Sequence, residues 1–372
     1  MSVDLEAQPG VAGAAEGVRD LAARHAADAD SSRKLPREVA DAVRDAGFAR
    51  HFVGRAHGGA EGTFAELTRA VVTVARGCAS TAWYASLAAY SGRIASHLPE
   101  AGRQVVWADG PDAVIATALM PAGRAEKTDG GWRLSGRWGY VSGIDFADWI
   151  LVCAVVRGAE GPPALRFFAL PWGTWTVEPT WDSVGMRATG SHTVTVTDTL
   201  VAEPFSFDRQ ELLTGRNGSS DRPVHNVPLP AVAGLPFVAP VVGAALGALD
   251  AAAATVTGRR RTPAGEVKLV RAAGRIEAAR LLVEQNAEAA DTHRFDRGLL
   301  ARAERNATTA AEILRESAGQ LVALAGTGGL GETHALQRHW RDITSATSHV
   351  ALQYETSAAK SHANALLGPA EE

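Results

Sequence analysis

The hydrophobic pattern of this chain changes its period twice, which limits the folds open to it. Before Pro111, apolar residues recur at helical spacing, as where Val39, Val43 and Ala46 share one helical face. After Pro111 the period shortens to two, and residues 193–197 alternate between Thr and Val. From about residue 235 the helical period returns. This order differs from a repeated βαβ pattern and predicts an α+β multidomain chain.

The changes of period also place the domain boundaries. We expect a helical N-terminal domain at 1–111, a small central β-domain at 112–205, and a linker with a C-terminal four-helix bundle at 206–372. Thr128 to Gly131 is a turn signal, so 123–136 is predicted to form a hairpin. Further strands are expected at 114–119, 149–156, 165–170 and 192–199.

The C-terminal apolar stripes are rich in small residues, which favours close packing between helices. Such stripes are typical of an antiparallel bundle. The four helices are expected at Leu235–Gly258, Gly265–His293, Leu299–Ala325 and His334–Leu367.

Composition excludes several classes of function. The net charge is −4, so no electrostatic footprint for nucleic acid or an anionic membrane is present. The longest apolar stretch is interrupted by prolines, and residues 1–10 lack the basic and apolar segments of a signal peptide. With Cys78 and Cys153 as the two cysteines, a disulfide framework is excluded. The histidines show no metal-ligand spacing and no G-x-G-x-x-G follows a strand, so we expect a cytoplasmic protein without a metal or a nicotinamide site.

Four segments, in order, resemble one enzyme family. They are Leu35–Gly59 with its Leu-Pro start and Gly-Gly end, Gly136–Trp149 with the pattern G-x-W-x-x-x-S-G-x-x-x-A-D-W, Val184–Ser191, and Gly326–Asp342 with its Gly-rich turn and Arg-Asp pair. Together they resemble the acyl-CoA dehydrogenase superfamily. The resemblance implies a helical N-terminal domain, a central β-domain and a four-helix bundle around a flavin.

The position of the catalytic base separates two readings of this resemblance. Common acyl-CoA dehydrogenases have a glutamate eight residues after the Asp of the Arg-Asp pair, where this chain has Val350. His349 beside it resembles the flavin-dependent monooxygenase branch. That branch uses O2 and reduced FAD or FMN from a separate reductase, and oxygenates its substrate through a C4a-hydroperoxyflavin. The alternatives are a dehydrogenase whose base lies elsewhere, or an idle binding protein that kept the fold.

The resemblance assigns roles near the flavin ring. Ser142 would contact the flavin N5, and His349 the peroxide, with a second role in deprotonating the substrate since a histidine titrates near neutral pH. Without the resemblance, Ser142 would be an ordinary turn serine and His349 a core histidine. Thr117 matches a region with a flavin or substrate contact, and an ordinary strand threonine is the equal alternative.

Further residues are expected at the flavin phosphates and the substrate. Arg259, Arg261, Gly328 and Gly329 are candidates for phosphate contacts across a subunit boundary, although arginines there would also complement a helix C-terminus. Thr189 and Ser191 are candidates for the flavin phosphate or ring. The substrate pocket is expected against Trp83, Tyr84 and Tyr90, which would equally serve as core aromatics. The resemblance also implies a homotetramer.

Overall fold

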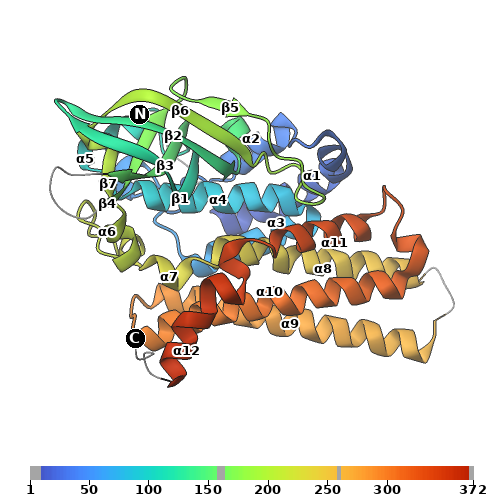
Figure 1. Cartoon of the computed structure of the whole chain (residues 1–372). Coiled ribbons are helices and arrows are strands. Elements are labelled where there is room, and N and C mark those ends of the chain that lie inside the picture. The colour runs from blue at the N-terminus through green and yellow to red at the C-terminus, as the bar shows by residue number, and fades with distance from the viewer. Residues whose placement is uncertain (1–9, 157–163, 258–260, 368–372) are drawn as a thin grey trace, which may run out of the picture.

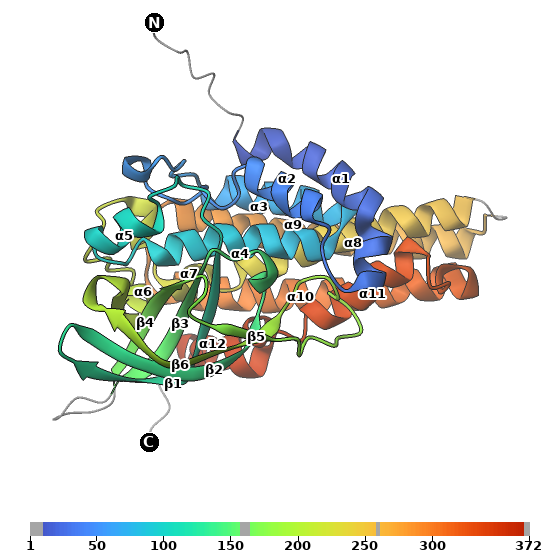
Figure 2. The same cartoon turned by 90° about the horizontal axis from the view of Figure 1, so that it is seen from above.

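The computed structural model describes residues 10–156, 164–257 and 261–367. It has the expected order of helices, sheet and helical bundle (Figure 1). The sheet lies on one side of helix α4, and the long helices of the bundle lie on the other (Figures 1 and 2). The predicted fold class is therefore confirmed.

The N-terminal part consists of five α-helices and one short 3₁₀ turn, and α4 is its centre. Nearly every residue of α4 is buried, because the helix contacts the other N-terminal helices, the sheet and the bundle. Side chains on α4 are thus placed between all three parts of the chain. The helices are α1 (Val11–Ser32), α2 (Arg37–Asp45), α3 (Phe64–Gly77), α4 (Ala79–Ala95) and α5 (Glu100–Val106), with η1 (Arg55–His57) before α3.

The sheet has seven strands in the order β5-β6-β2-β1-β3-β4-β7. The strands are β1 (Ile115–Thr128), β2 (Gly131–Val141), β3 (Trp149–Val156), β4 (Ala164–Pro171), β5 (Thr176–Glu178), β6 (His192–Ala202) and β7 (Ser206–Asp208). Thr128 pairs with Gly131 at the tip of the predicted hairpin, and β1 runs parallel to β3 while the other neighbours are antiparallel. The pattern did not predict β5 and β7, which are too short to show an alternation.

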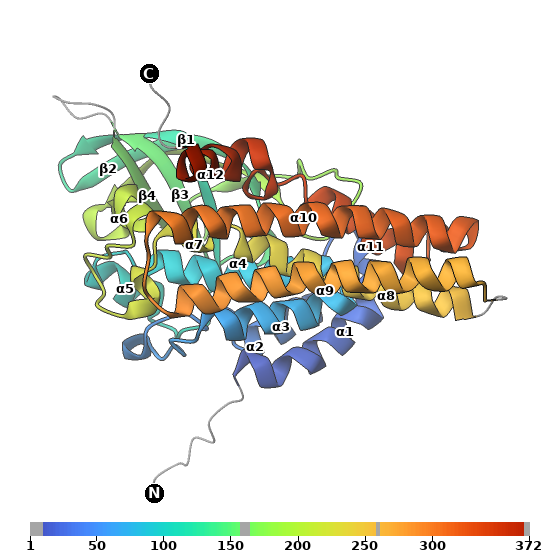
Figure 3. The same ribbon diagram turned by 90° about the horizontal axis from the view of Figure 1, so that it is seen from below.

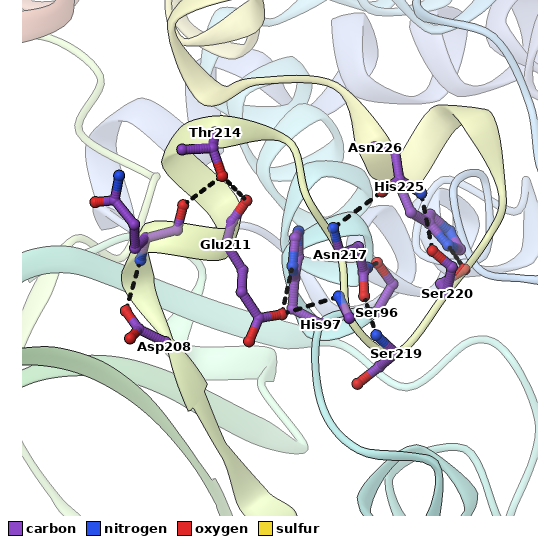
Figure 4. A network of polar contacts seen from close by, with 12 residues as sticks. Ser96, His97, Asp208, Glu211, Thr214, Asn217, Ser219, Ser220, His225 and Asn226 are labelled. Atoms are coloured by element: carbon purple, nitrogen blue, oxygen red, sulfur yellow. Dashed lines mark hydrogen bonds and ion pairs between the residues drawn. The ribbon is translucent and has the colours of Figure 1, made fainter.

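The segment expected as a linker is folded onto the N-terminal domain. It contains η3 (Glu203–Phe205), β7, α6 (Arg209–Thr214), η4 (Pro223–Asn226) and α7 (Leu229–Val232). Figure 4 shows its polar contacts with the end of α4. Asn217 Nδ2 donates to Ser96 Oγ over 3.1 Å, and the His225 ring nitrogen Nε2 lies 2.7 Å from the Phe52 carbonyl oxygen. These buried contacts explain why a polar, Pro- and Gly-rich stretch is ordered here.

The bundle has three long helices and one interrupted helix. Its elements are α8 (Leu235–Thr257), α9 (Pro263–Asp291), α10 (Arg297–Ala325), η5 (Gly326–Gly329), α11 (Ala335–Ala346), η6 (Val350–Leu352), η7 (Tyr354–Ala358) and α12 (Ala359–Leu367). Figure 3 shows α9 and α10 side by side along their length. The expectation of one continuous helix over 334–367 is wrong.

The break follows Thr347. The hydroxyls of Thr344, Thr347 and Ser348 each donate to the carbonyl four residues earlier, an arrangement that competes with continuation of the helix. The His349 side chain then caps the next turn, so this residue sits at a helix boundary and not within a helix.

Helix α8 runs through the middle of the bundle. Residues 229–257 are apolar and long enough to cross a membrane, but 78% of the apolar window is buried inside the structure. Gly243 permits the close approach of α3, because a Cβ at this position would overlap the Val72 carbonyl oxygen. The segment is therefore the core helix of a soluble fold.

Candidate active site

The turn after strand β2 presents Ser142 at the meeting point of the sheet and α4. Gly143 follows with a φ of 75°, a conformation that glycine adopts without strain, and then comes η2 (Ile144–Phe146). The Gly143 N–H donates to the Thr189 carbonyl oxygen over 2.8 Å. The Tyr84 ring packs below this turn, and a Cβ on Gly143 would lie 3.0 Å from it. Tyr84 thus supports the turn from inside the fold.

Ser142 belongs to a row of hydrogen-bonded side chains. The Trp83 indole N–H donates to Ser142 Oγ over 3.2 Å, and Ser142 Oγ lies 2.8 Å from Ser191 Oγ. Ser191 Oγ in turn lies 2.7 Å from Thr189 Oγ1. Trp83, Thr189 and Ser191 are buried, whereas Ser142 is partly exposed. Thr189 and Ser191 therefore lie behind Ser142.

The loop carrying Thr189 is held by the C-terminal Arg-Asp pair. Asp342 Oδ1 accepts from the Met186 N–H over 2.6 Å, and burial raises the pKa of this carboxyl to about 7. The Met186 carbonyl oxygen accepts from Trp181 Nε1 over 2.9 Å and from Thr189 Oγ1 over 3.0 Å. Arg341 anchors the start of the same loop by donating to the Val184 carbonyl oxygen. Two motifs far apart in sequence thus form one support for the site.

His349 lies on the bundle side of Trp83. Its ring stacks on Phe237 with centroids 3.8 Å apart, and it meets the Trp83 ring edge-on at 5.9 Å. His349 Nδ1 accepts from the Ala351 N–H over 3.2 Å, so the neutral ring carries its proton on Nε2. Burial lowers the pKa of this imidazole to about 4. The expectation that His349 titrates near neutral pH is therefore wrong, and the ring is a neutral donor.

An exposed aromatic residue beside Ser142 was missed in the sequence. Tyr140 is 80% exposed and has a φ of 60°, which is uncommon for a residue with a side chain. Its ring stands edge-on to Trp181 at 6.2 Å. An aromatic surface held in this way next to a hydroxyl suits a planar ring system. The place of Tyr140 within the G-x-W-x-x-x-S-G motif was the available signal.

Comparisons with known proteins agree with this geometry. Residues 11–104 match the acyl-CoA dehydrogenase N-terminal domain, and residues 235–354 match the acyl-CoA dehydrogenase C-terminal domain. The FADH2-dependent resorcinol hydroxylase oxygenase component of Rhizobium sp. (strain MTP-10005) is 29% identical, over 92% of this chain and 90% of its own.

Solved structures superpose along almost the whole chain. The HsaA monooxygenase from M. tuberculosis has a TM-score of 0.91 at 26% identity and covers 98% of both chains. XiaF from Streptomyces sp., solved in complex with FADH2 and glycerol, has a TM-score of 0.90 at 26% identity and covers 97% of this chain and 95% of its own. The chain belongs to the acyl-CoA dehydrogenase superfamily, in its flavin-dependent monooxygenase branch.

Two further predicted residues of this flavin-dependent monooxygenase lie on the second half of α4 or on the strand beside it. Thr117 Oγ1 donates to Ser91 Oγ over 2.8 Å, linking β1 to α4, and the sequence reading missed Ser91. Tyr90 packs among Phe52 and Phe64, and burial raises the pKa of its hydroxyl. Among the described residues, the Tyr90 hydroxyl has no hydrogen-bond partner. Trp83 thus lies beside both Ser142 and His349, whereas Tyr90 lies in the aromatic core.

The candidate phosphate ligands lie at the end of the bundle away from the sheet (Figures 1 and 3). Arg261 Nε donates to Glu266 over 2.9 Å and its side chain is largely exposed. Gly328 and Gly329 belong to the turn after α10, and a Cβ on Gly329 would crowd Leu336. Arg259 lies outside the described residues. Among the described residues, Arg261, Gly328 and Gly329 make no hydrogen bond or ion pair to the Ser142 turn.

Proposed function

We propose that this protein is the oxygenase component of a two-component monooxygenase that hydroxylates a small aromatic substrate with O2 and reduced flavin. The observation that carries the proposal is the convergence of Ser142 and His349 on Trp83, with Val350 where a dehydrogenase has its base. Reduced flavin, when bound, supplies the activated oxygen. The protein supplies orientation, hydrogen bonds and exclusion of water.

The residues at the turn suit the flavin ring. Ser142 offers one hydroxyl to N5, and the exposed Tyr140 ring offers an aromatic surface beside it. Trp83 and Phe237 place apolar rings between this turn and the bundle, which keeps the reacting region poor in water. His349 contributes an N–H donor at Nε2, which suits stabilisation of negative charge on oxygen.

A dehydrogenase reaction is not favoured because it requires a carboxylate base near the substrate. Among the described residues, no hydrogen bond or ion pair joins a carboxylate to Trp83, Ser142 or His349. Burial is the cause that lowers the pKa of the His349 imidazole. The site is therefore built to donate and accept hydrogen bonds without a charged base.

The proposed substrate class is supported by the side chains near Trp83 and by the relatives. Apolar rings of Trp83 and Phe237 suit an aromatic ring, and the Ser91–Thr117 pair suits a hydroxyl substituent. Relatives are named for resorcinol hydroxylation, indole-3-acetate oxygenation and p-hydroxyphenylacetate 3-hydroxylation. We assign a phenol or a similarly sized aromatic compound as the substrate, in the cytoplasm.

The test is oxygen transfer from labelled O2. The protein is mixed with photoreduced FAD or FMN, ¹⁸O2 and each of three phenols. The products are then separated and their masses are measured by mass spectrometry. Incorporation of one ¹⁸O atom into a product is expected, and Ser142→Ala should reduce it while Ser219→Ala, in the surface loop after α6, should not. Absence of label in every product, together with dye reduction by an acyl thioester, would establish the dehydrogenase alternative.

The distal residues are proposed to act across a subunit boundary. Arg261, Gly328 and Gly329 would contact the second phosphate and adenosine of FAD held by another subunit of a homotetramer. Arg261→Ala should then weaken binding of FAD and leave binding of FMN unchanged, because FMN lacks that half. Arg271→Ala, on an exposed part of α9, is the matched control. Light scattering that gives a monomer would contradict this arrangement.

A further inference from the structure

Ser142 and the hydroxyl groups behind it form a hydrogen-bonded row. One end of this row determines which group donates in each contact. The row runs from Trp83 through Ser142 and Ser191 to Thr189, and it ends on the Met186 carbonyl oxygen. A carbonyl oxygen accepts hydrogen bonds and never donates them, and an indole N–H donates and never accepts. The Met186 carbonyl oxygen therefore sets the direction of the row, and the Trp83 N–H is compatible with it because it occupies one lone pair of Ser142 Oγ.

Each hydroxyl has one proton, so once the donor in one contact is known, the donor in the next contact is determined as well. Thr189 donates its proton to the Met186 carbonyl oxygen over 3.0 Å. In the 2.7 Å contact between Thr189 and Ser191, the donor is therefore Ser191. In the 2.8 Å contact between Ser191 and Ser142, the donor is then Ser142.

This assignment leaves Ser142 without a proton to give. Its own proton points to Ser191, and one of its two lone pairs receives the Trp83 N–H. The remaining lone pair is on the one partly exposed member of the row. Towards a ligand, Ser142 is thus an acceptor.

The end of the row is held firmly. The Met186 carbonyl oxygen also accepts from Trp181 Nε1 and from the Thr189 N–H over 3.2 Å, and the Met186 N–H is fixed by Asp342. Thr189 and Ser191 are buried, where loss of a hydrogen bond is costly. Reversal of the row would leave such a bond unmade.

We propose that this row selects the redox state of the flavin, with Thr189, Ser191 and Trp83 as positioning residues that make Ser142 an acceptor. Reduced flavin carries a hydrogen on N5 and can donate to Ser142, whereas oxidised flavin has an acceptor at N5. Two acceptors facing each other repel. The row therefore favours capture of reduced flavin and release of the oxidised form. This inference rests on the proposed function, because it places the flavin N5 at Ser142.

The test compares affinities for the two redox states. Oxidised FAD and dithionite-reduced FAD are each equilibrated with the protein without oxygen, and free flavin is measured after ultrafiltration and reoxidation. The wild-type protein should bind reduced FAD at least about tenfold more tightly. In Thr189→Val the hydroxyl that receives the Ser191 proton is gone, so Ser191 can donate to Ser142 and free the Ser142 proton. The ratio of the two dissociation constants should then fall by about five- to tenfold.

Matched variants separate this role from a structural one. Thr189→Ser keeps the hydroxyl and should keep the wild-type ratio, while Ser191→Ala should lower it as Thr189→Val does. A general disturbance of the site would weaken both redox states equally, and an unchanged ratio in Thr189→Val and Ser191→Ala overturns the inference. Equal wild-type affinity for both states also overturns it and leaves the proposed function intact. Failure of the proposed function would be recognised by a different result, because no ¹⁸O would then enter any product.

Discussion

The Trp83 indole N–H donates to Ser142 Oγ over 3.2 Å, and this bond connects the N-terminal helices to the turn after β2. The same indole ring meets His349 edge-on, so one side chain touches both proposed active-site residues. Trp83 thus combines a polar contact at its nitrogen with an apolar surface towards the bundle, as buried tryptophans commonly do.

Trp83→Phe should separate these two contributions. The phenyl ring keeps the packing against Phe237 and His349 but removes the donor to Ser142, at a cost of about 1 kcal/mol. We expect the free energy of unfolding to fall by about this amount and the product formed per flavin oxidised to fall as well. Trp175→Phe is the control, since the Trp175 N–H has no hydrogen-bond partner among the described residues. An equal amount of product per flavin oxidised in both variants would show that the Trp83 hydrogen bond has no part in oxygen transfer.

His349 should give no inflection in the pH profile near its ordinary pKa. Burial lowers the pKa of this imidazole to about 4, so the ring is neutral at every pH above that value. Product yield per flavin oxidised should therefore be flat between about pH 5.5 and pH 8 as far as this residue is concerned. His349→Ala should lower the yield by about tenfold, with Glu355→Ala, an exposed residue of the same segment, as control. An inflection near pH 6.5 that disappears in His349→Ala would contradict the buried neutral state.

Asp342 should make the stability depend on pH in the opposite sense to an ordinary acidic residue. Its folded-state pKa is raised to about 7, so the folded protein binds a proton that the unfolded chain releases above about pH 4. Stability from this group is present at low pH and is lost as pH rises through 7. Asp342→Asn keeps an oxygen acceptor for the Met186 N–H and removes the titration.

The melting temperature measures this effect. The difference between Asp342→Asn and wild type should increase in favour of the variant from pH 5 to pH 8. Asp342→Ala lacks the acceptor and should lose about 1–3 kcal/mol at every pH. A constant difference for Asp342→Asn across this range would mean that Asp342 stays ionised in the folded protein.

Gly243 should tolerate no side chain. An added Cβ would overlap the Val72 carbonyl oxygen, so Gly243→Ala should force α3 and α8 apart and destabilise the protein by about 1–3 kcal/mol. Gly274→Ala is the matched control, because that exposed glycine of α9 has no atom near its Cβ position. It should stabilise the helix by about 0.5–1 kcal/mol. Similar unfolding curves for both variants would contradict the close contact.

Local signals predicted most of the fold. The turn at 128–131 fixed the hairpin, and the period of two fixed β6, because both depend on neighbouring residues. The fold of 206–235 was missed because it depends on distant partners such as Phe52 for His225. The break after Thr347 was missed because no proline or glycine marks it. Three hydroxyls that bond to preceding carbonyls are a weaker signal than either residue.

The sequence nominated candidate site residues but not the contacts between them. The motif resemblance selected Ser142, His349, Thr189 and Ser191, and the structure brings Ser142, Thr189 and Ser191 into one row. Helical spacing placed Trp83 and Tyr90 on one face. It did not show that Trp83 contacts Ser142 and His349 whereas Tyr90 packs among phenylalanines. Phe237 carried no signal, because in a continuous apolar helix one phenylalanine resembles the rest. Whether Thr117 and Arg261 contact flavin stays a prediction.

A continuous helix after Thr347 would have to keep the packing of the bundle and also place the residues around His349. The break after Thr347 separates these two roles. Bundle helices keep their apolar residues in register over many turns, so an insertion or exchange in one of them shifts everything that follows. Because the chain leaves the helix before His349 and starts a new turn there, exposed residues of this segment such as Val350 can vary without changing the register of the bundle helices, while Leu352 stays in the core. Substrate range can therefore be altered in this short segment by directed evolution without loss of the scaffold.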